Sequence, residues 1–301
     1  MSDSIKIVTE PTVYLVGKQT IDNAELDRFL ADHEVSHWTT DTEVAGEKLV
    51  EVAGRLCYMS FAKPRPGGNS AYIDHILEVG HGSVLEHAVY NLVITGVSRS
   101  LTHELVRHRA GMGYSQLSQR YVDESDTAFV VPPVLLDEIA AGVRFYEDNK
   151  TQRGLSGYRD AFERCCLMRD TSPNGILETE GLQWLAGREQ NLEEYERLVC
   201  YLARKMPNDL DITSRRKAAR EAARSVLPNA TETKIFVTGN ARALRHFIEM
   251  RGSLHADAEI RRLAVAVHSI LEADSPNIFG DYERKAHKDG SAWLNPLHAK
   301  V

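Results

Sequence analysis

The densest group of side chains that could do chemistry lies between residues 104 and 109. Glu104 is followed three and four residues later by Arg107 and His108, and Arg109 comes next. On a helix this spacing would let the carboxylate orient and partly neutralise the cations. Adjacent cations repel one another, and a bound polyanion is one way to offset the repulsion. The alternative is an exposed basic helix end, which the helix dipole favours.

A run of small and polar residues, Ala110 to Tyr121, follows this group directly. Gly111 and Gly113 would allow the backbone to approach a ligand closely, because glycine has no side chain. The serine, glutamine and arginine residues of the run supply donors of the kind that bind phosphate. This segment therefore predicts a phosphate site for a nucleotide or a flavin.

A second basic group lies in the last third of the chain, where Arg216, Arg220 and Arg224 recur every four residues beside Glu221. Runs of charge usually face solvent, so a solvated basic face is the first interpretation. Arg224 differs because apolar residues and Pro228 follow it within about one turn. A buried or ligand-facing guanidinium is more plausible at that position.

Arg251 is a charge on an apolar stripe. Leu244, Phe247 and Ile248 mark the buried face of their helix, and Arg251 follows Phe247 by four residues. A buried charge is costly unless it is paired. The pattern therefore requires a partner carboxylate or an anionic ligand, and it leaves both open.

The glycine-rich link from Gly80 to His87 holds two histidines and a glutamate. A metal site needs three or more converging ligands, and the sequence has no HExxH motif, so we expect no metal. The motifs of serine hydrolases and P-loop nucleotidases are also absent.

Composition limits the partners. The 301 residues include 36 Lys and Arg against 43 Asp and Glu, a formal net charge of −7, which argues against a general nucleic-acid binder. The hydrophobic content of 43% is that of an ordinary globular protein. No apolar stretch approaches the roughly 20 residues of a membrane helix. We therefore expect neither a nucleic-acid nor a membrane partner.

Four cysteines, Cys57, Cys165, Cys166 and Cys200, are too sparse for a disulfide framework and lack CxxC spacing. The first residues, Met1 to Ser4, lack the basic segment and apolar core of a secretory signal. A cytoplasmic protein is the expectation.

The sequence predicts that both helices and strands position these residues. We expect helices over 71–79, from Ser98 or Ser100 to about 109, from Thr213 or Ser214 to 226, over 241–251 between an Asn240 cap and Gly252, and over 260–271. Strands are expected over 88–95 and 233–237. Without regular strand and helix alternation, the pattern predicts the α+β class.

The middle of the chain, 137–210, is helical, charged and broken near Gly154, Gly157 and the turn at 171–175. It offers little chemistry. We interpret it as peripheral helices or as an inserted interaction element.

Several of these motifs together resemble a known family. Arg107-His108-Arg109, followed after a short spacer by Ser118-Gln119-Arg120-Tyr121, resembles the signature of the flavin-dependent thymidylate synthases, the ThyX family. Further segments resemble the family in family order, namely 80–87, 224–228, 238–242 and 251–255. The resemblance covers most of the chain from about 42 to 275, apart from the middle.

The resemblance implies a single catalytic domain over 1–301 with an extended helical insertion around 137–210. It also implies a central antiparallel sheet flanked by helices, and a homotetramer with active sites shared between subunits. Such enzymes hold FAD, take a methylene group from 5,10-methylenetetrahydrofolate, and use NADPH to reduce the flavin. The product is a uridine monophosphate methylated at C5.

The resemblance also assigns roles to residues. Flavin contacts would come from Ser83, Arg107, His108, Arg109, Gln116, Asn240, Arg242 and His246, with His81 by the flavin ring and the folate path and His255 flanking the flavin. The nucleotide would be held by Glu104, Leu105, Val106, Arg107, Gln116, Leu117, Ser118, Gln119, Arg120, Arg224 and Arg251. Arg251 would also be catalytic, because it would face the pyrimidine and favour ionisation of N3.

One departure bears on the substrate. Eight residues, Ala110 to Leu117, separate Arg109 from Ser118, whereas the family signature has seven. A branch of the family methylates UMP, and an altered loop could fit a 2′-hydroxyl, so we hypothesise that UMP is accepted, alone or alongside dUMP. The alternatives are a strict dUMP-specific thymidylate synthase and a non-catalytic nucleotide-binding protein.

Overall fold

The computed structural model describes residues 5–63, 65–168, 170–207, 209–287 and 290–300. Met1 to Ser4, on which the expectation of no secretory signal was based, lie outside the described residues. The chain divides into two compact units. The helical unit comprises Met1–Glu10, Gly96–Thr102 and Gln116–Lys234, and the sheet unit comprises Pro11–Thr95, His103–Ser115 and Ile235–Val301.

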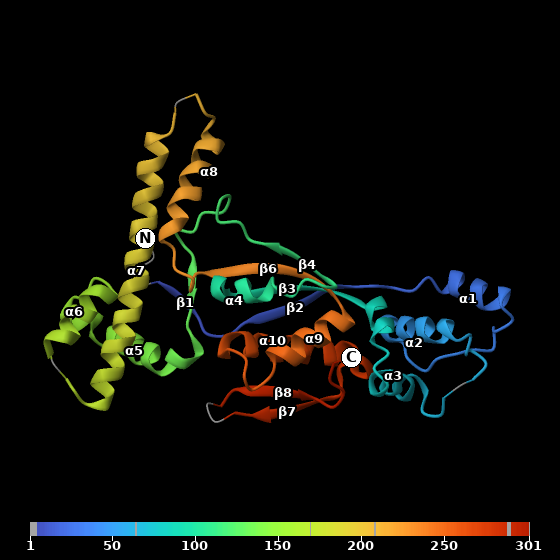
Figure 1. Cartoon of the computed structure of the whole chain (residues 1–301). Coiled ribbons are helices and arrows are strands. Elements are labelled where there is room, and N and C mark those ends of the chain that lie inside the picture. The colour runs from blue at the N-terminus through green and yellow to red at the C-terminus, as the bar shows by residue number, and fades with distance from the viewer. Residues whose placement is uncertain (1–4, 64, 169, 208, 288–289, 301) are drawn as a thin grey trace. The chain divides into compact units, whose positions relative to one another are not determined.

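The helical unit is built mainly from the middle of the chain (Figure 1). Its elements are β1 (Lys6–Val8), β5 (Ala128–Val130), η2 (Pro133–Leu135), α5 (Leu136–Arg153), α6 (Tyr158–Met168), α7 (Pro173–Lys205), α8 (Ile212–Ala223) and η3 (Arg224–Val226). Strands β1 and β5 pair in parallel. The helices pack around a core that includes Ile139, Phe145, Tyr158, Leu182 and Leu185.

Two glycines let α5 and α7 cross closely. A Cβ atom on Gly181 would lie 1.8 Å from the carbonyl oxygen of Glu138, and one on Gly142 would lie 2.7 Å from the backbone nitrogen of Leu182. No larger residue fits at either position without separating the two helices. The predicted helical middle is confirmed, and its predicted break at Gly154 is a C-cap with φ of 64°.

The start of α8 differs from the prediction. Asp211, and neither Thr213 nor Ser214, is the N-cap, because its carboxylate accepts hydrogen bonds from the backbone N–H groups of both of those residues at 2.9 and 3.1 Å. The α-helix also ends at Ala223, and the predicted last turn to Val226 is a 3₁₀ turn.

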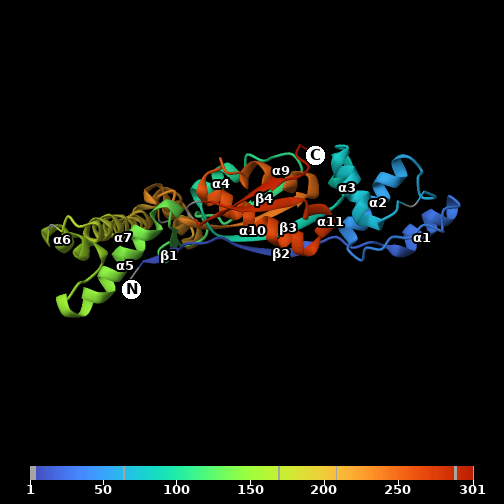
Figure 2. The same cartoon turned by 90° about the horizontal axis from the view of Figure 1, so that it is seen from below.

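The sheet unit carries most of the remaining elements (Figure 2). They are β2 (Thr12–Lys18), α1 (Asn23–Asp32), α2 (Ala45–Cys57), α3 (Gly68–Glu78), η1 (Gly82–His87), α9 (Ala241–Arg251), α10 (Ala258–Asp274), α11 (Pro276–Phe279), β7 (Tyr282–Ala286) and β8 (Ala292–Pro296). The unit boundaries fall inside β3 (Val89–Ser98), α4 (Arg99–Leu105), β4 (Met112–Gln116) and β6 (Glu232–Asn240).

The largest sheet has four strands in the order β2-β3-β6-β4. Strands β2 and β3 are antiparallel, with Thr12 opposite Thr95 and Lys18 opposite Tyr90. Strands β7 and β8 form a second antiparallel pair. The described residues therefore mix helices with antiparallel strand pairs and the parallel pair of β1 and β5, in agreement with the predicted α+β class. Both predicted strands are present but extend further, to Ser98 and to Asn240.

Helix α4 is shorter than predicted. Ser98 caps it as expected, because its hydroxyl accepts a hydrogen bond from the Leu101 N–H at 3.0 Å. The helix ends at Leu105 and not near Arg109. The Arg107 N–H bonds to the Glu104 carbonyl at 3.2 Å, an i to i−3 contact that closes a tight turn after the helix.

Helix α9 has both of its predicted ends. The Asn240 side chain accepts a hydrogen bond from the Ala243 N–H at 2.8 Å, and Gly252 follows the last residue, Arg251. The predicted helices over 71–79 and 260–271 are present as α3 and α10.

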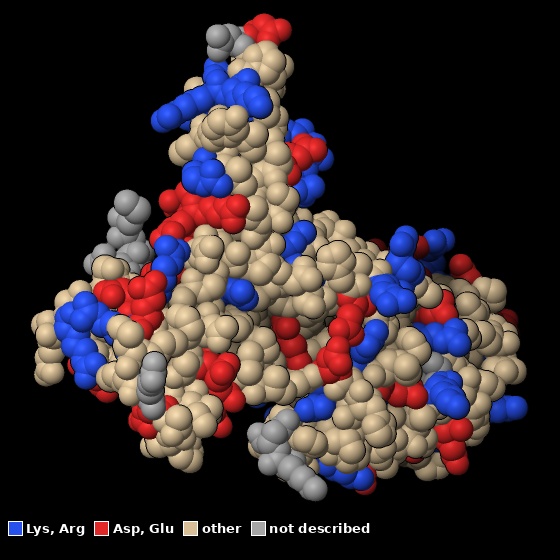
Figure 3. All heavy atoms as spheres, turned by 60° about the vertical axis from the view of Figure 1, so that its left-hand side comes forward, with Lys and Arg blue, Asp and Glu red and all other residues tan. Residues whose placement is uncertain are grey.

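Surface charge is mixed on the face drawn in Figure 3, where lysine and arginine side chains lie among aspartate and glutamate side chains. Among the described residues, no helix combines the length and the apolar character needed to cross a membrane.

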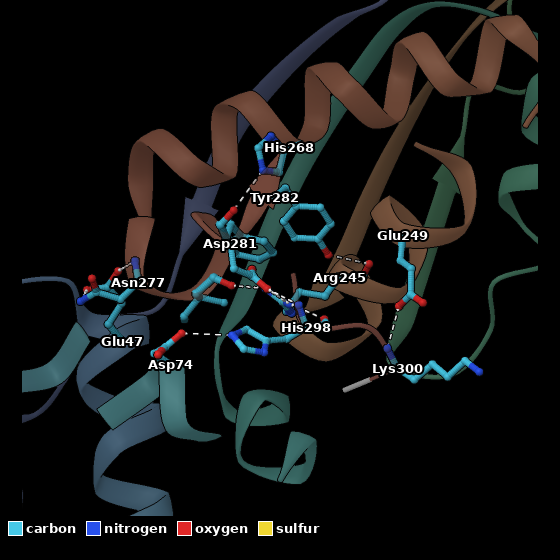
Figure 4. Close-up of polar contacts among 12 residues, drawn as sticks. Glu47, Asp74, Arg245, Glu249, His268, Asn277, Asp281, Tyr282, His298 and Lys300 are labelled. Carbon is cyan, nitrogen blue, oxygen red and sulfur yellow. Dashed lines mark hydrogen bonds and ion pairs between the residues drawn. The ribbon is translucent and has the colours of Figure 1, made fainter. Parts of the chain in front are cut away.

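A buried ion pair joins α9 to the chain just before β7. Arg245 and Asp281 have side chains only 4% and 9% exposed, and two hydrogen bonds connect them (Figure 4). The Arg245 guanidinium also donates to the backbone carbonyl of Ile278. Burial and pairing together make this interaction sensitive to loss of either partner.

We therefore expect Asp281→Ala to lower the free energy of unfolding by about 3–5 kcal/mol, because it leaves a buried guanidinium without its anion. Denaturation in guanidinium chloride, followed by circular dichroism, measures the change. Glu25→Ala is the control, because it breaks the exposed pair with Arg28 and should cost less than about 1 kcal/mol. Equal losses in the two variants would contradict the role of the buried pair.

Candidate active site

Helix α9 lines a cleft in the sheet unit along most of its length. The cleft has a volume of about 550 Å³. Asn240, Arg242 and His246, three of the predicted flavin contacts, line it. The other lining residues are Glu86, Ala110, Gly111, Ala243, Glu249, Met250 and Lys300. The structure therefore gathers the α9 residues of the predicted flavin site around one cavity.

Gly111 brings the loop after Arg109 against the start of α9. Its φ is +69°, and a Cβ atom there would lie 2.6 Å from the Asn240 side-chain nitrogen and 2.9 Å from the Ala243 Cβ. The Gly111 carbonyl accepts a hydrogen bond from the Asn240 N–H at 3.1 Å. Gly111 thus lets the loop backbone approach helix α9 closely, whereas the sequence analysis expected a close approach to a ligand. Gly113 lies in β4 with more room around it.

Arg251 meets both Glu104 and His108. Its Nη1 donates to the Glu104 carboxylate at 2.9 Å, and its Nε donates to His108 Nε2 at 3.1 Å. The partner carboxylate required by the apolar stripe is therefore present. Arg251 and Glu104 remain 27% and 30% exposed, so solvent or a ligand can reach the pair. Glu104 thus pairs with a cation 147 residues away, and not within its own helix with Arg107 as expected.

His108 is held as a neutral acceptor. Burial, the Arg251 cation and His246 lower the pKa of His108 to about 4. Its ring packs edge-on against Phe247 with centroids 5.4 Å apart. The neutral ring suits the hydrogen bond from Arg251, because an imidazolium would have no free nitrogen to accept it.

Glu104 faces a second carboxylate. Burial and a contact with Asp257 raise the pKa of Glu104, the neighbouring Glu259 adds to this, and Arg251 opposes it. Asp257 is the residue that precedes α10. The sequence analysis missed Asp257, since nothing local indicates that it reaches Glu104.

The predicted nucleotide contacts of the loop lie in the helical unit, together with Arg224. The Gln116 amide nitrogen donates to the hydroxyls of Thr102 and Thr233 at 3.1 and 3.3 Å. Arg120 Nε donates to Glu221 on α8 at 3.0 Å. Arg224 follows Glu221 by three residues and is half-buried. Helix α8 therefore orients Arg120, and it ends directly before Arg224.

Arg220 on this helix is not on a solvated basic face, as the repeat suggested. It donates to the Tyr121 carbonyl at 2.9 Å and to the Asp123 carboxylate at 2.7 Å, and its side chain is only 19% exposed. Arg220 thus fixes the chain after Arg120, while Arg216 is exposed as expected. This role needed the fold, because the sequence does not show what faces α8.

Arg99 lies near Arg224 and Glu124, and the sequence analysis missed both Arg99 and Glu124, although it named Gln119 as a nucleotide contact. Burial lowers the pKa of Arg99, with Arg224 nearby adding to the effect, and burial raises the pKa of Glu124. In the part of the chain that the structure describes, Arg99 Nη1, Gln119 Nε2 and Glu124 Oε1 are buried polar atoms without a hydrogen-bond partner. Such atoms are costly unless a water or a ligand satisfies them.

The other predicted contacts are more dispersed. His81 is exposed and stacks on the Tyr58 ring, with centroids 6.5 Å apart. Leu105 is buried, and Val106, Leu117 and Ser118 are half-buried. The remaining predicted residues are exposed, namely Ser83, Arg107, Arg109 and His255.

The lowered pKa of His108 predicts a pH dependence of stability. Between about pH 6.5 and pH 4 the unfolded chain binds a proton at His108 and the folded chain does not, so stability falls as the pH falls through this range. We expect His108→Gln, which keeps an acceptor for Arg251, to remove about 1–2 kcal/mol of that loss after allowance for partial exposure.

Unfolding free energies at several pH values from 7 to 4 measure this difference. His103→Gln, at an exposed position in the same unit, is the control. A wild type and a His108→Gln variant with parallel pH profiles would refute the prediction.

Known proteins resemble this chain over most of its length. Residues 40–277 match the model of the Thy1 family, described as thymidylate synthase complementing protein. The chain is 47% identical over 260 residues to a flavin-dependent thymidylate synthase of Mycobacterium sp. (strain JLS), covering 84% of this chain and 86% of the relative.

Two further relatives with the same description come from Mycobacterium tuberculosis (strain ATCC 25177 / H37Ra) and Mycobacterium marinum (strain ATCC BAA-535 / M). The first is 44% identical over 265 residues, covering 87% of this chain and 89% of the relative. The second is 44% identical over 276 residues, covering 91% and 94%. The family match and these identities extend through the predicted motifs and the helical middle. The chain therefore belongs to the Thy1 family of flavin-dependent thymidylate synthases.

Proposed function

We propose that this protein methylates C5 of dUMP to form thymidylate, with 5,10-methylenetetrahydrofolate as carbon donor and NADPH as the source of electrons. The observation that carries the proposal is the contact of Arg251 with Glu104 and His108, which joins three residues of the family motifs from two distant segments. The three relatives compared above are described as flavin-dependent thymidylate synthases, which favours dUMP over UMP.

The cleft at α9 fits a flavin dinucleotide. Its lining combines a guanidinium, an imidazole and a side-chain amide, which suit a phosphorylated, aromatic cofactor. Arg242 and His246 are exposed within it, and Asn240 holds the helix start that faces it. Bound FAD, once reduced, would supply the hydride that turns the transferred methylene group into a methyl group.

The chain's own contribution to chemistry centres on Arg251. Its Nη1 and Nε are committed to Glu104 and His108, which fixes the plane of the guanidinium and leaves Nη2 to face the pyrimidine. A fixed cation at that position stabilises negative charge on the ring with little reorganisation. Glu104 acts as a positioning residue in this scheme, and His108 accepts from Arg251 without adding a competing charge.

The nucleotide phosphate would be bound by the loop and α8. Arg120 and Arg224 offer guanidinium groups for bidentate contacts, and Gln116 and Ser118 add neutral donors. The buried amide nitrogen of Gln119, which lacks a partner among the described residues, is a donor that a bound nucleotide could satisfy directly or through water.

The remaining family roles are part of the same proposal. Flavin or folate contacts would come from His81, Ser83, Arg107, Arg109 and His255, and nucleotide contacts from Leu105, Val106 and Leu117. We also propose a homotetramer of single-domain subunits, with 137–210 as an extension of the catalytic domain.

The choice between dUMP and UMP can be tested directly. The ground for considering UMP was the spacer from Ala110 to Leu117, which has eight residues. We expect turnover of dUMP with kcat/KM at least about 100-fold above that of UMP, since a site closed around deoxyribose rejects an added hydroxyl. Measuring both substrates under identical conditions, with FAD, NADPH and methylenetetrahydrofolate, decides it. Comparable turnover of UMP would favour the ribonucleotide alternative, and a protein that takes up no added FAD and turns over neither nucleotide would favour the non-catalytic alternative.

The role of Arg251 predicts a split between turnover and binding. Arg251→Ala should lower kcat by about 100-fold or more while the KM for dUMP changes only a few-fold, because its main contact forms in the transition state. Arg28→Ala, at an exposed ion pair, is the control and should behave as wild type. Retained flavin absorbance would show that the variant is folded, and an unchanged kcat would overturn the role.

A further inference from the structure

Hydrogen bonds with several elements of the sheet unit hold the segment after β8 in place (Figure 4). The His298 N–H donates to the Asp281 carboxylate at 3.3 Å, and the His298 carbonyl accepts from the Arg245 guanidinium at 3.2 Å. On its other side, the His298 ring contacts Asp74 of α3 at 3.1 Å. The segment is therefore tied to the buried ion pair and has a defined path.

This path brings Lys300 to the wall of the α9 cleft. The Lys300 N–H donates to the Glu249 carboxylate of α9 at 3.0 Å, and both residues line the cleft with Arg242 and His246. Lys300 has φ of 60°, a left-handed conformation that costs a residue with a side chain about 1 kcal/mol or more. The surrounding contacts hold it there, so the position of Lys300 is specified by the fold.

The cleft also needs more positive charge than α9 alone provides. Arg242 Nη1 donates to Glu86 at 2.6 Å, so part of its charge is already compensated. Glu249 adds a second carboxylate to the lining, and it is bound through the backbone N–H of Lys300. A diphosphate carries two negative charges, which a single compensated arginine would balance poorly.

We propose that the Lys300 ammonium, together with Arg242, binds the diphosphate of the flavin dinucleotide. The assignment rests on the proposed function, since it takes the α9 cleft as the flavin site. It adds a cofactor-binding residue that lies outside every family segment of the sequence and outside the matched residues 40–277. The segment 297–300 then holds this cation at the wall of the cleft.

The test measures flavin affinity and not activity. Binding of FAD, FMN and riboflavin to wild type and to Lys300→Ala is titrated by flavin fluorescence, with Lys300→Arg as the charge-preserving variant. Lys285→Ala is the matched control, because Lys285 is a half-exposed lysine of β7 that pairs with Glu283 away from the cleft. Thermal unfolding of each variant checks that the fold is kept.

We expect Lys300→Ala to weaken FAD binding by about five- to twentyfold, the range of a partly exposed contact between a lysine and a phosphate. The loss should be smaller for FMN and absent for riboflavin, and Lys300→Arg should restore most of it. Unchanged FAD affinity in Lys300→Ala, or equal losses for FAD and riboflavin, would overturn the assignment. A wild type that binds no flavin at all would overturn the proposed function itself.

Discussion

The pairing of Arg245 with Asp281 is the interaction on which the arrangement of the candidate site depends. A guanidinium only 4% exposed is tolerated because a buried carboxylate faces it, and the backbone carbonyls of Ile278 and His298 accept further hydrogen bonds from it. Tyr282 adds to this by packing under Arg245, with the guanidinium 5.1 Å from the ring centroid, and by donating to the Arg245 carbonyl. These contacts fix how helix α9 packs against β7 and the segment after β8.

Because α9 is held in this way, its other charged residues can contact side chains that are distant in the sequence. Arg242 reaches Glu86, 156 residues earlier, and Arg251 reaches Glu104, 147 residues earlier. One eleven-residue helix thereby orients both the cleft assigned to the flavin and the guanidinium assigned to the pyrimidine. Groups held by rigid elements and paired partners are preorganised, which is what electrostatic catalysis requires.

Local signals were sufficient to predict α9 but not its partners. The Asn240 cap, the Gly252 stop and the demand for an anion at Arg251 all follow from residues within one helix. Arg245 was missed, although it lies four residues after Ala241 and three before Ile248 on the buried face. Glu104 was not predicted as the partner of Arg251, because the positions of two residues in the sequence do not show how far apart they lie in the fold. The predicted end of α4 near Arg109 and the predicted cap of α8 at Thr213 or Ser214 were wrong for a related reason, since competing turn and capping groups differ by small energies.

Arg251 has to satisfy two requirements that oppose each other. A fixed guanidinium needs an anionic partner, yet a full negative charge on Glu104 cancels part of the field that would stabilise an ionised pyrimidine. Burial and the contact with Asp257 raise the pKa of Glu104, so they disfavour the charged form that Arg251 in turn stabilises. His108 resolves the same conflict differently, since its neutral ring orients Nε without contributing any charge. The site thus orients its cation through two acceptors, of which Glu104 opposes the field of Arg251 at the ligand and the neutral His108 does not.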